Sequence, residues 1–282
     1  MRTVYINGNY VAENEATVSI FDRGLLFADA VYEVVGVWHG KLLDFDYHME
    51  RLSRSLAAMG IDPPLDRDEL LLMHRELVHI NHITNGMIYL QVTRGAEDRE
   101  FVPSAGLKPT VFAFTQQRHP EDESANQNGV RLKSCEDLRW ARRDIKTVGL
   151  MGQVFAKQQA HQAGAAEALL VSNGVITECA SSSFFIIKDG LIITRPLSRE
   201  ILPGVTRRCL LEMLEQEIVS VEQRNVTLSE ALQADEAFMT GASTFFFPVI
   251  AIDDHDIGTG KPGALTLKLQ QMFFAKILEE GI

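Results

Sequence analysis

The sequence predicts an α+β protein of two domains. Short runs rich in β-branched and aromatic residues alternate with segments of helical periodicity along the 282 residues. One polar stretch with almost no apolar residues, residues 117–129, interrupts this pattern. We therefore expect an N-terminal α+β domain over residues 1–116, a linker over 117–129 and a C-terminal domain over 130–282.

The N-terminal domain is predicted to begin with two hairpins. The first has strands at residues 3–7 and 10–11 around the turn dipeptide Asn7-Gly8, and the second has strands at 31–38 and 41–45. Helical spacing then predicts one helix that begins at Asp46, which can cap it, and another over residues 66–80. Strands are expected at 87–93 and 110–115, with a long polar loop between them.

The C-terminal domain is predicted to alternate strands and helices. Asn173-Gly174 and Asp189-Gly190 are typical dipeptides of tight hairpin turns. The expected strands cover residues 130–134, 168–172, 175–178, 184–187, 191–194, 219–223, 237–240 and 249–252, and the expected helices cover 149–164, 206–216 and 262–278.

Composition excludes several classes of function. The formal net charge is −11, so the chain has no broad positive field for nucleic acid or anionic membranes. No window approaches the ~20 apolar residues of a membrane span, and the first residues lack the pattern of a signal peptide. Three scattered cysteines and three histidines of unsuitable spacing predict neither a disulfide framework nor a metal site. We expect a cytoplasmic protein.

Lys146 and Glu178 are the first candidates for chemistry. A lysine that acts as a nucleophile at neutral pH needs desolvation, nearby positive charge or a standing imine, and Arg142 and Arg143 supply nearby charge. Glu178 ends a predicted strand before a small, hydroxyl-rich turn, where a carboxylate can bind a protonated ring nitrogen. By position alone, the lysine could also be a surface residue and the glutamate a solvated hairpin end.

Three further segments are candidates for binding an anion. Residues 202–206 form a Pro/Gly turn into an amphipathic helix, whose free N–H groups suit a phosphate, although Thr206 could simply cap the helix. The small residues 240–244 allow close backbone approach to a ligand. Arg51 lies off the apolar stripe of its helix and could reach a phosphate as a fork donor, or be a solvated helix arginine.

These motifs together resemble the fold type IV pyridoxal-phosphate enzymes over essentially the whole chain, and most closely the D-amino-acid aminotransferases. The resemblance implies a small α/β sandwich domain and a larger pseudo-barrel α/β domain, with the cofactor in the cleft between them. The matching stretches are Asp22–Gly24 with Asp29–Glu33, His48–Leu52, Val92–Gly95, Arg139–Lys146, Thr177–Glu178 with the serine run after it, and Leu202–Arg207.

The resemblance also implies the cofactor, pyridoxal 5′-phosphate, and the residues that bind it. Lys146 would form the internal aldimine and carry the proton between substrate Cα and cofactor C4′. Glu178 would keep the pyridine nitrogen protonated. The other implied contacts are Leu202 on the ring face, Arg51, Val205 and Thr206 on the phosphate, and Ala242 and Ser243 in a turn that adds donors.

On the substrate side, the resemblance implies Tyr32 and Arg99. Arg99 matches the arginine of a carboxylate trap on a loop that reaches the partner subunit of a homodimer, but Phe101 stands where the best-known relatives have a histidine. The implied reaction is the transfer of an amino group from a D-amino acid, with D-alanine as the expected donor, to 2-oxoglutarate in two half-reactions. The alternatives are a branched-chain L-amino-acid or (R)-amine transaminase, an aminodeoxychorismate lyase, and an acidic interaction module without cofactor.

Overall fold

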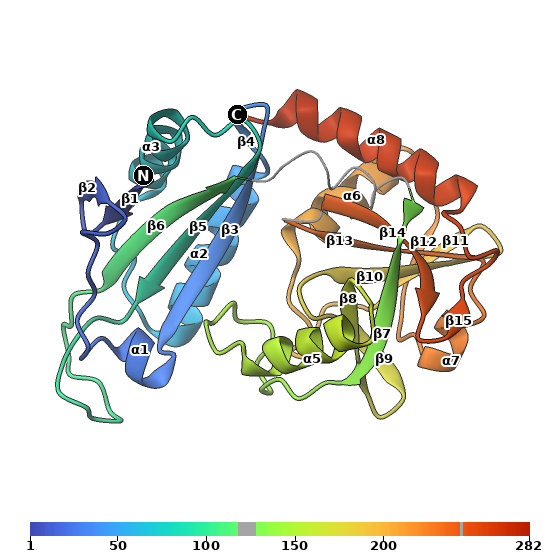
Figure 1. Cartoon of the computed structure of the whole chain (residues 1–282), viewed down its shortest axis with the longest axis horizontal. Coiled ribbons are helices and arrows are strands. Elements are labelled where there is room, and N and C mark those ends of the chain that lie inside the picture. The colour runs from blue at the N-terminus through green and yellow to red at the C-terminus, as the bar shows by residue number, and fades with distance from the viewer. Residues whose placement is uncertain (118–127, 243–244) are drawn as a thin grey trace. The chain divides into compact units, whose positions relative to one another are not determined.

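The computed structural model describes residues 1–117, 128–242 and 245–282 and divides the chain into two compact units (Figure 1). The first unit comprises Met1–His119, Ile145–Gly149 and Glu280–Ile282, and the second comprises Pro120–Asp144 and Leu150–Glu279. Most of the expected linker, residues 118–127, lies outside the described residues. Two segments that the sequence placed in the C-terminal domain, 145–149 and 280–282, thus belong to the first unit.

A six-stranded antiparallel sheet forms the first unit. Its order is β2 (Asn9–Ala12), β1 (Thr3–Ile6), β6 (Thr110–Gln117), β5 (Gly86–Thr93), β3 (Ala30–Trp38) and β4 (Lys41–Leu42). Asn7 and Gly8 join β1 to β2 with φ of 45° and 91°, as the predicted turn dipeptide requires. β4 stops short of the expected residue 45, because the chain turns at Asp44 with φ of 52° and Phe45 begins the next helix.

Two long helices, α2 (Phe45–Met59) and α3 (Arg67–Ile80), cover one face of this sheet (Figure 1). Asp66 caps α3 through a capping box with Glu69, so this start is confirmed. The expected cap of α2 is wrong: Asp46 lies inside its first turn, and Asp44 occupies the N-cap position without a side-chain cap bond. The sequence also missed the short α1 (Arg23–Phe27).

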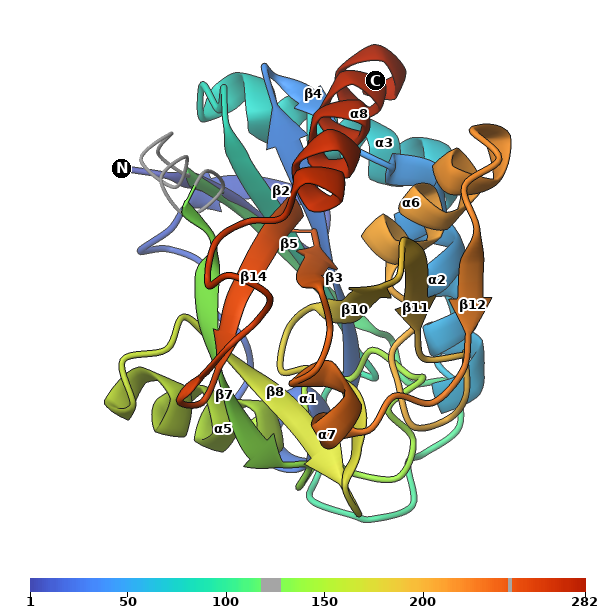
Figure 2. The ribbon, with the colours of Figure 1, turned by 90° about the vertical axis from the view of Figure 1, so that its right-hand side faces the viewer.

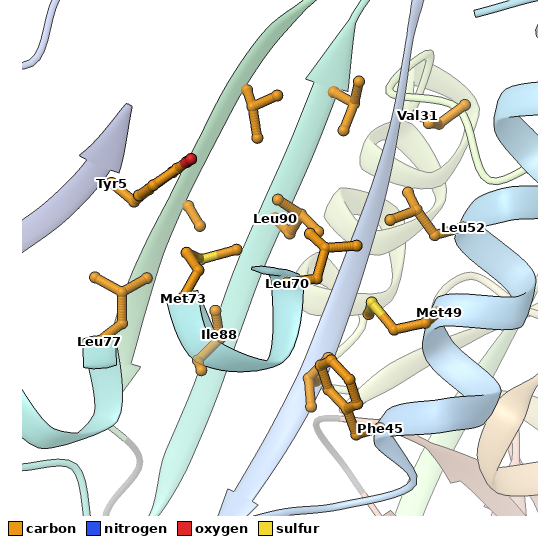
Figure 3. Close-up of a cluster of buried hydrophobic side chains, with 14 of the residues drawn as sticks. Tyr5, Val31, Phe45, Met49, Leu52, Leu70, Met73, Leu77, Ile88 and Leu90 are labelled. Carbon is orange, nitrogen blue, oxygen red and sulfur yellow. The ribbon is translucent and has the colours of Figure 1, made fainter. Parts of the chain in front are cut away.

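The core of the first unit lies between these helices and the sheet, as Figure 3 shows. On β3 the alternate residues Val31, Val35 and Val37 are fully buried, as a strand with one covered face requires. Glu33 occupies the same face and is also fully buried. The labelled core side chains are Tyr5, Val31, Phe45, Met49, Leu52, Leu70, Met73, Leu77, Ile88 and Leu90.

A mixed sheet forms the second unit. Along its path lie β12 (Val221–Gln223), β11 (Leu191–Thr194), β10 (Ser183–Lys188), β13 (Glu236–Gly241), β14 (Phe245–Ile252), β7 (Val130–Glu136), β8 (Glu167–Ser172) and β9 (Val175–Cys179), while β15 (His255–Asp256) pairs with β14. The two ends of this path meet, because Ile176 N in β9 donates to Val226 O, three residues after β12, at 2.9 Å. The sheet is therefore rolled into the expected pseudo-barrel.

Four helices of the described chain accompany this sheet: α5 (Met151–Gln162), α6 (Val205–Gln216), α7 (Leu228–Ala231) and α8 (Ala264–Glu280). α5 lies alongside β7 and β8 in both views (Figures 1 and 2), and α6 contacts β13. The sequence predicted α5, α6 and α8 and missed the short α7 and β15. None of the described helices is both long and apolar enough to cross a membrane.

Candidate active site

Lys146 is held by its backbone between a strand and a helix of the first unit. Its carbonyl accepts a hydrogen bond from Tyr32 N in β3 at 3.0 Å. Its own N–H donates to Ser55 Oγ in α2 at 3.3 Å. The next residue, Thr147, forms a β-bridge with Val31. These contacts fix the position from which the lysine side chain extends.

The amine of Lys146 lies over the ring of Tyr32, with Nζ 4.2 Å from the ring centroid. The ring face attracts an ammonium without accepting its proton. Among the residues that the structure describes, no carboxylate forms an ion pair with Lys146. The side chain is half-buried, so it is not the exposed surface lysine that its position alone allowed. The structure thus brings two of the predicted site residues together.

Arg51 forms a buried ion pair with Glu33. Arg51 Nε donates to Glu33 Oε1 at 2.8 Å and Nη2 donates to Oε2 at 2.7 Å, while His48 Nδ1 lies 2.7 Å from the same Oε2. Burial alone would raise the pKa of Glu33, but Arg51 and His48 outweigh it and hold the pKa well below its usual range. Arg51 is therefore not a solvated helix arginine. The sequence signal for its partner was a glutamate in the valine-rich strand β3.

Arg99 lies on the exposed loop between β5 and β6 of the first unit. Its guanidinium carbon lies 5.1 Å from the ring centroid of Phe27 and 5.4 Å from that of Phe101. Within the described part of the chain, Arg99 has no recorded contact with Lys146 or Tyr32. The structure therefore places this predicted substrate residue on an aromatic support, apart from the other two.

Glu178 is a buried carboxylate of the second unit with one engaged oxygen. Its Oε1 accepts from Arg139 Nη1 at 2.5 Å and from Leu202 N at 3.0 Å, whereas none of the described residues donates to Oε2. Burial raises the pKa of Glu178, although Arg139 opposes this effect. Asp137 holds Arg139 through two further hydrogen bonds of 2.8 and 2.9 Å. Glu178 is therefore no solvated hairpin end, and it has an oxygen to offer a cationic ligand.

The N-terminus of α6 lies two residues beyond Leu202. Gly204 is its N-cap, and no side chain of the described residues caps the helix, so the first N–H groups, including those of Val205 and Thr206, lack helical acceptors. A Cβ on Gly204 would lie 2.7 Å from Ser183 Oγ, so α6 begins close against the start of β10. An uncapped helix N-terminus of this kind suits a phosphate.

The end of β13 adjoins the same place, because Thr240 pairs with Ser183 in the sheet. Ala242 follows β13 directly, and Ser243 lies outside the described residues. In the described chain, Thr240 Oγ1 and Arg207 Nε are buried without a hydrogen-bond partner. Such atoms cost about 1–3 kcal/mol each when unsatisfied, which favours a polar ligand nearby. The sequence placed Thr240 in the candidate segment 240–244 and Arg207 in the matching stretch Leu202–Arg207, but it gave neither side chain a role.

The second unit therefore carries an acceptor for a cationic ring atom and donors for an anionic group, with Leu202 in the chain between them. This pair of features fits the pyridine nitrogen and the phosphate of pyridoxal phosphate. The first unit carries Lys146, whose Nζ lies over Tyr32, and the buried Arg51. The sequence named Arg139 only as the start of a matching stretch and gave it no role, since its partner Glu178 lies 39 positions away in the chain.

Comparison with known proteins gives consistent matches over nearly the whole chain. The model of the family described as amino-transferase class IV matches residues 30–252. The D-alanine aminotransferase of Bacillus licheniformis is 41% identical over 278 residues, which cover 98% of each chain. The D-alanine aminotransferase of Staphylococcus haemolyticus is 38% identical over 275 residues, which cover 97% of each chain.

Solved structures of branched-chain amino acid aminotransferases share the fold. The Escherichia coli protein matches with a TM-score of 0.93 at 24% identity, covering 98% of this chain and 94% of its own. The Thermoproteus uzoniensis protein matches with a TM-score of 0.88 at 24% identity, covering 99% of this chain and 95% of its own. At this identity the likeness establishes the fold type IV architecture.

The buried ion pair predicts how stability depends on pH. Glu33→Gln should destabilise the protein by about 3–5 kcal/mol at pH 7, because it leaves the buried guanidinium of Arg51 without its counter-ion. The pKa of Glu33 is depressed, so its contribution is complete above about pH 4.3 and falls by about 1.4 kcal/mol per pH unit below it. Urea unfolding of the wild type and of Glu33→Gln from pH 7 to pH 3 measures the difference in their free energies of unfolding, which should become smaller as the pH falls. The exposed Glu15→Gln is the control, and a difference that stays constant to pH 3 would contradict the assignment.

Proposed function

Because this chain belongs to the amino-transferase class IV family, we propose that it is a pyridoxal-phosphate enzyme that transfers the amino group of a D-amino acid to 2-oxoglutarate. D-alanine is the proposed donor. Relatives named D-alanine aminotransferase, 36–41% identical over nearly the full chain, support this choice. One observation supports pyridoxal phosphate as the cofactor: the second unit contains both the buried carboxylate of Glu178 and the uncapped N-terminus of α6.

When bound, pyridoxal phosphate supplies an electron sink that stabilises negative charge on the substrate Cα. Lys146 would hold the cofactor through Nζ, and, once the substrate amine had displaced it there, the released Nζ would move the proton to and from that Cα. The backbone contacts of Lys146 with β3 and α2 fix the point from which its side chain extends for both tasks. Tyr32, directly under the amine, is proposed to line the substrate side.

The proposed role of Glu178 is to hold a proton on the ring nitrogen. Arg139 and the N–H of Leu202 both bind Oε1 and fix the orientation of the carboxylate, which leaves Oε2 for the ring N–H. Leu202 is proposed to pack on the ring face. The N–H groups of Val205 and Thr206, the turn at Ala242 and Ser243, and Arg51 are proposed to bind the phosphate.

Arg99 is proposed to bind the substrate carboxylate. A guanidinium suits this task because it binds a carboxylate with two parallel hydrogen bonds. Phe101, in place of the expected histidine, is 77% exposed and supplies the Arg99 guanidinium with an aromatic surface instead of a second donor.

We propose a cytoplasmic enzyme, since Cys135, Cys179 and Cys209 are all free thiols, as in a reducing compartment.

The second copy of a homodimer is the proposed partner. Five apolar side chains are 50–82% exposed: Ile20, Phe21, Leu25, Phe101 and Val102. They lie on two segments of the first unit, around residues 20–25 and 101–102, and hydrogen bonds join these two segments. Apolar side chains gathered on a surface in this way are typical of protein interfaces.

Light scattering at micromolar concentration should give twice the mass of the 31.5 kDa chain. Phe101→Asp should shift the mass toward that of the monomer. The control Ile218→Asp, at an exposed site of the second unit, should not change the mass. A wild-type protein with the mass of a monomer would refute the dimer.

Removal of the amine tests the proposed chemistry. The purified protein with pyridoxal phosphate should be yellow, and Lys146→Ala should lose the bound-cofactor absorption band and at least about 10²–10⁴-fold in turnover. Lys268→Ala, at an exposed position of α8, should retain both the absorption band and the turnover.

Single turnovers with D-alanine, L-leucine, (R)-phenylethylamine and aminodeoxychorismate, followed by the change in the bound-cofactor absorption band, identify the donor. A faster reaction with any of the other three would overturn the choice of D-alanine.

Glu178→Gln tests the carboxylate. A hydrogen bond between charged groups contributes about 1.5–3 kcal/mol, so the variant should bind pyridoxal phosphate about 10- to 100-fold more weakly. Because burial raises the pKa of Glu178, its ionised form costs stability, and the cofactor-free variant should be at least as stable as the wild type at pH 7. Glu167→Gln is the matched control, since it removes another buried carboxylate of the same unit, one that pairs with the exposed Lys157. Equal cofactor affinity of wild type and Glu178→Gln would exclude the role.

A further inference from the structure

The loop that carries Arg99 is exposed but well anchored. Residues 99–102 all lie at the surface, and the loop has no helix or strand of its own between β5 and β6. Gly95 opens the loop with φ of 111°, and a Cβ there would lie 2.2 Å from Lys108 O at its far end. The loop is thus closed at its base. Another contact must fix its tip, where Arg99 lies.

Arg23, the first residue of α1, makes the contacts that hold the tip of the loop. Its Nη1 donates to Glu97 Oε1 at 2.9 Å and to Glu100 O at 2.5 Å. Its Nη2 donates to Phe101 O at 3.1 Å. One guanidinium therefore holds the loop on both sides of Arg99, through the carboxylate of residue 97 and the carbonyls of residues 100 and 101.

A second route runs through the ring of Phe27 at the end of α1. The guanidinium carbon of Arg23 lies 4.8 Å from the centroid of this ring, and that of Arg99 lies 5.1 Å from it. The ring of Phe101 lies 5.4 Å from Phe27 and 5.4 Å from the Arg99 guanidinium. Arg23 thus supports both the backbone beside Arg99 and the aromatic surface under its side chain.

Arg23 is itself firmly held and only 3% exposed. Its Nε donates to Asp29 Oδ2 at 2.9 Å, and Arg94 donates to the same carboxylate. Four acceptors in different directions require the planar fork of an arginine, which the single ammonium of a lysine cannot replace. Glu97 adds a link within the loop, because its Oε2 accepts from Ser104 N at 3.1 Å.

We propose that Arg23 is a positioning residue for the substrate carboxylate: it holds the 97–104 loop so that Arg99 keeps the place and direction in which it binds substrate. The proposal rests on the proposed role of Arg99. The contacts of Arg23 are with Asp29, Phe27 and the loop, so in the proposal it acts through Phe27 and the loop backbone. Its loss should therefore weaken the binding of both the amino acid and the oxo acid without changing the cofactor site.

The test compares Arg23→Lys and Glu97→Ala with the matched control Arg94→Lys in the holoenzyme. Glu97→Ala leaves the pair of Arg23 and Asp29 intact, so it serves if Arg23→Lys fails to fold. Arg94 shares Asp29 with Arg23, but its other acceptors are Met59 O and Gly60 O, away from the loop. We expect KM for D-alanine and 2-oxoglutarate to rise about 10-fold in the first two variants, with kcat within about 3-fold of wild type. Arg94→Lys should leave KM unchanged.

Two further measurements show whether Arg23 acts through Arg99 and the loop. In an Arg99→Gln background, Arg23→Lys should add no further increase in KM, because the positioned group is already absent. Hydrogen exchange of the backbone amides between residues 98 and 104 should be faster in Arg23→Lys and Glu97→Ala, and unchanged in Arg94→Lys. This second readout is independent of catalysis.

The outcomes separate the two proposals. If Arg99→Gln raises KM while Arg23→Lys and Glu97→Ala do not, the role of Arg23 is refuted and that of Arg99 is supported. If Arg99→Gln leaves KM unchanged, the carboxylate role of Arg99 is refuted, and the inference with it, even where hydrogen exchange shows that Arg23 orders the loop. An unchanged exchange rate in both loop variants would also overturn the inference.

Discussion

The pairing of residues 145–149 with β3 is the constraint on which the candidate site depends. This segment follows the first strand of the second unit in the chain, yet it is part of the first unit. Its backbone bonds to Tyr32 and Ser55 determine where Lys146 stands and which ring lies beneath its amine. A lysine on a free loop would sample many positions, whereas the backbone of this one is held by a strand and a helix, as its proposed role in covalent and proton-transfer chemistry requires.

Buried ion pairs organise the charged residues around this position. Glu33 sits among valines of β3 and holds Arg51, and Asp137 with Glu178 holds Arg139. Burying charges is costly, and such pairs add little to stability compared with apolar side chains of similar size. Their benefit is orientation, because a guanidinium with two or more fixed acceptors cannot rotate. The buried Arg23, bound to Asp29 and to the 97–104 loop, follows the same principle.

Elements governed by neighbouring residues were predicted well from the sequence. The dipeptides Asn7-Gly8 and Asn173-Gly174 adopt positive φ and join adjacent strands, and the capping box at Asp66 starts α3. The sequence was wrong at the start of α2, where Asp46 looked like the cap. Phe45 is 2% exposed in the core, so packing of its ring rather than a capping side chain decides where that helix begins.

The sequence by itself determined the family, the α+β class and the residue types of the candidate site, because turns, periodicity and ordered motifs are local properties of the chain. It named Lys146, Arg51 and Glu178 as candidates but did not identify the residues that they contact. Only the tertiary structure decided that Arg51 pairs with Glu33, that Arg139 pairs with Glu178 and that Arg23 holds the loop of Arg99. These partners lie 18 to 78 positions apart, and a contact between such residues exists only once the sheet and helices have packed.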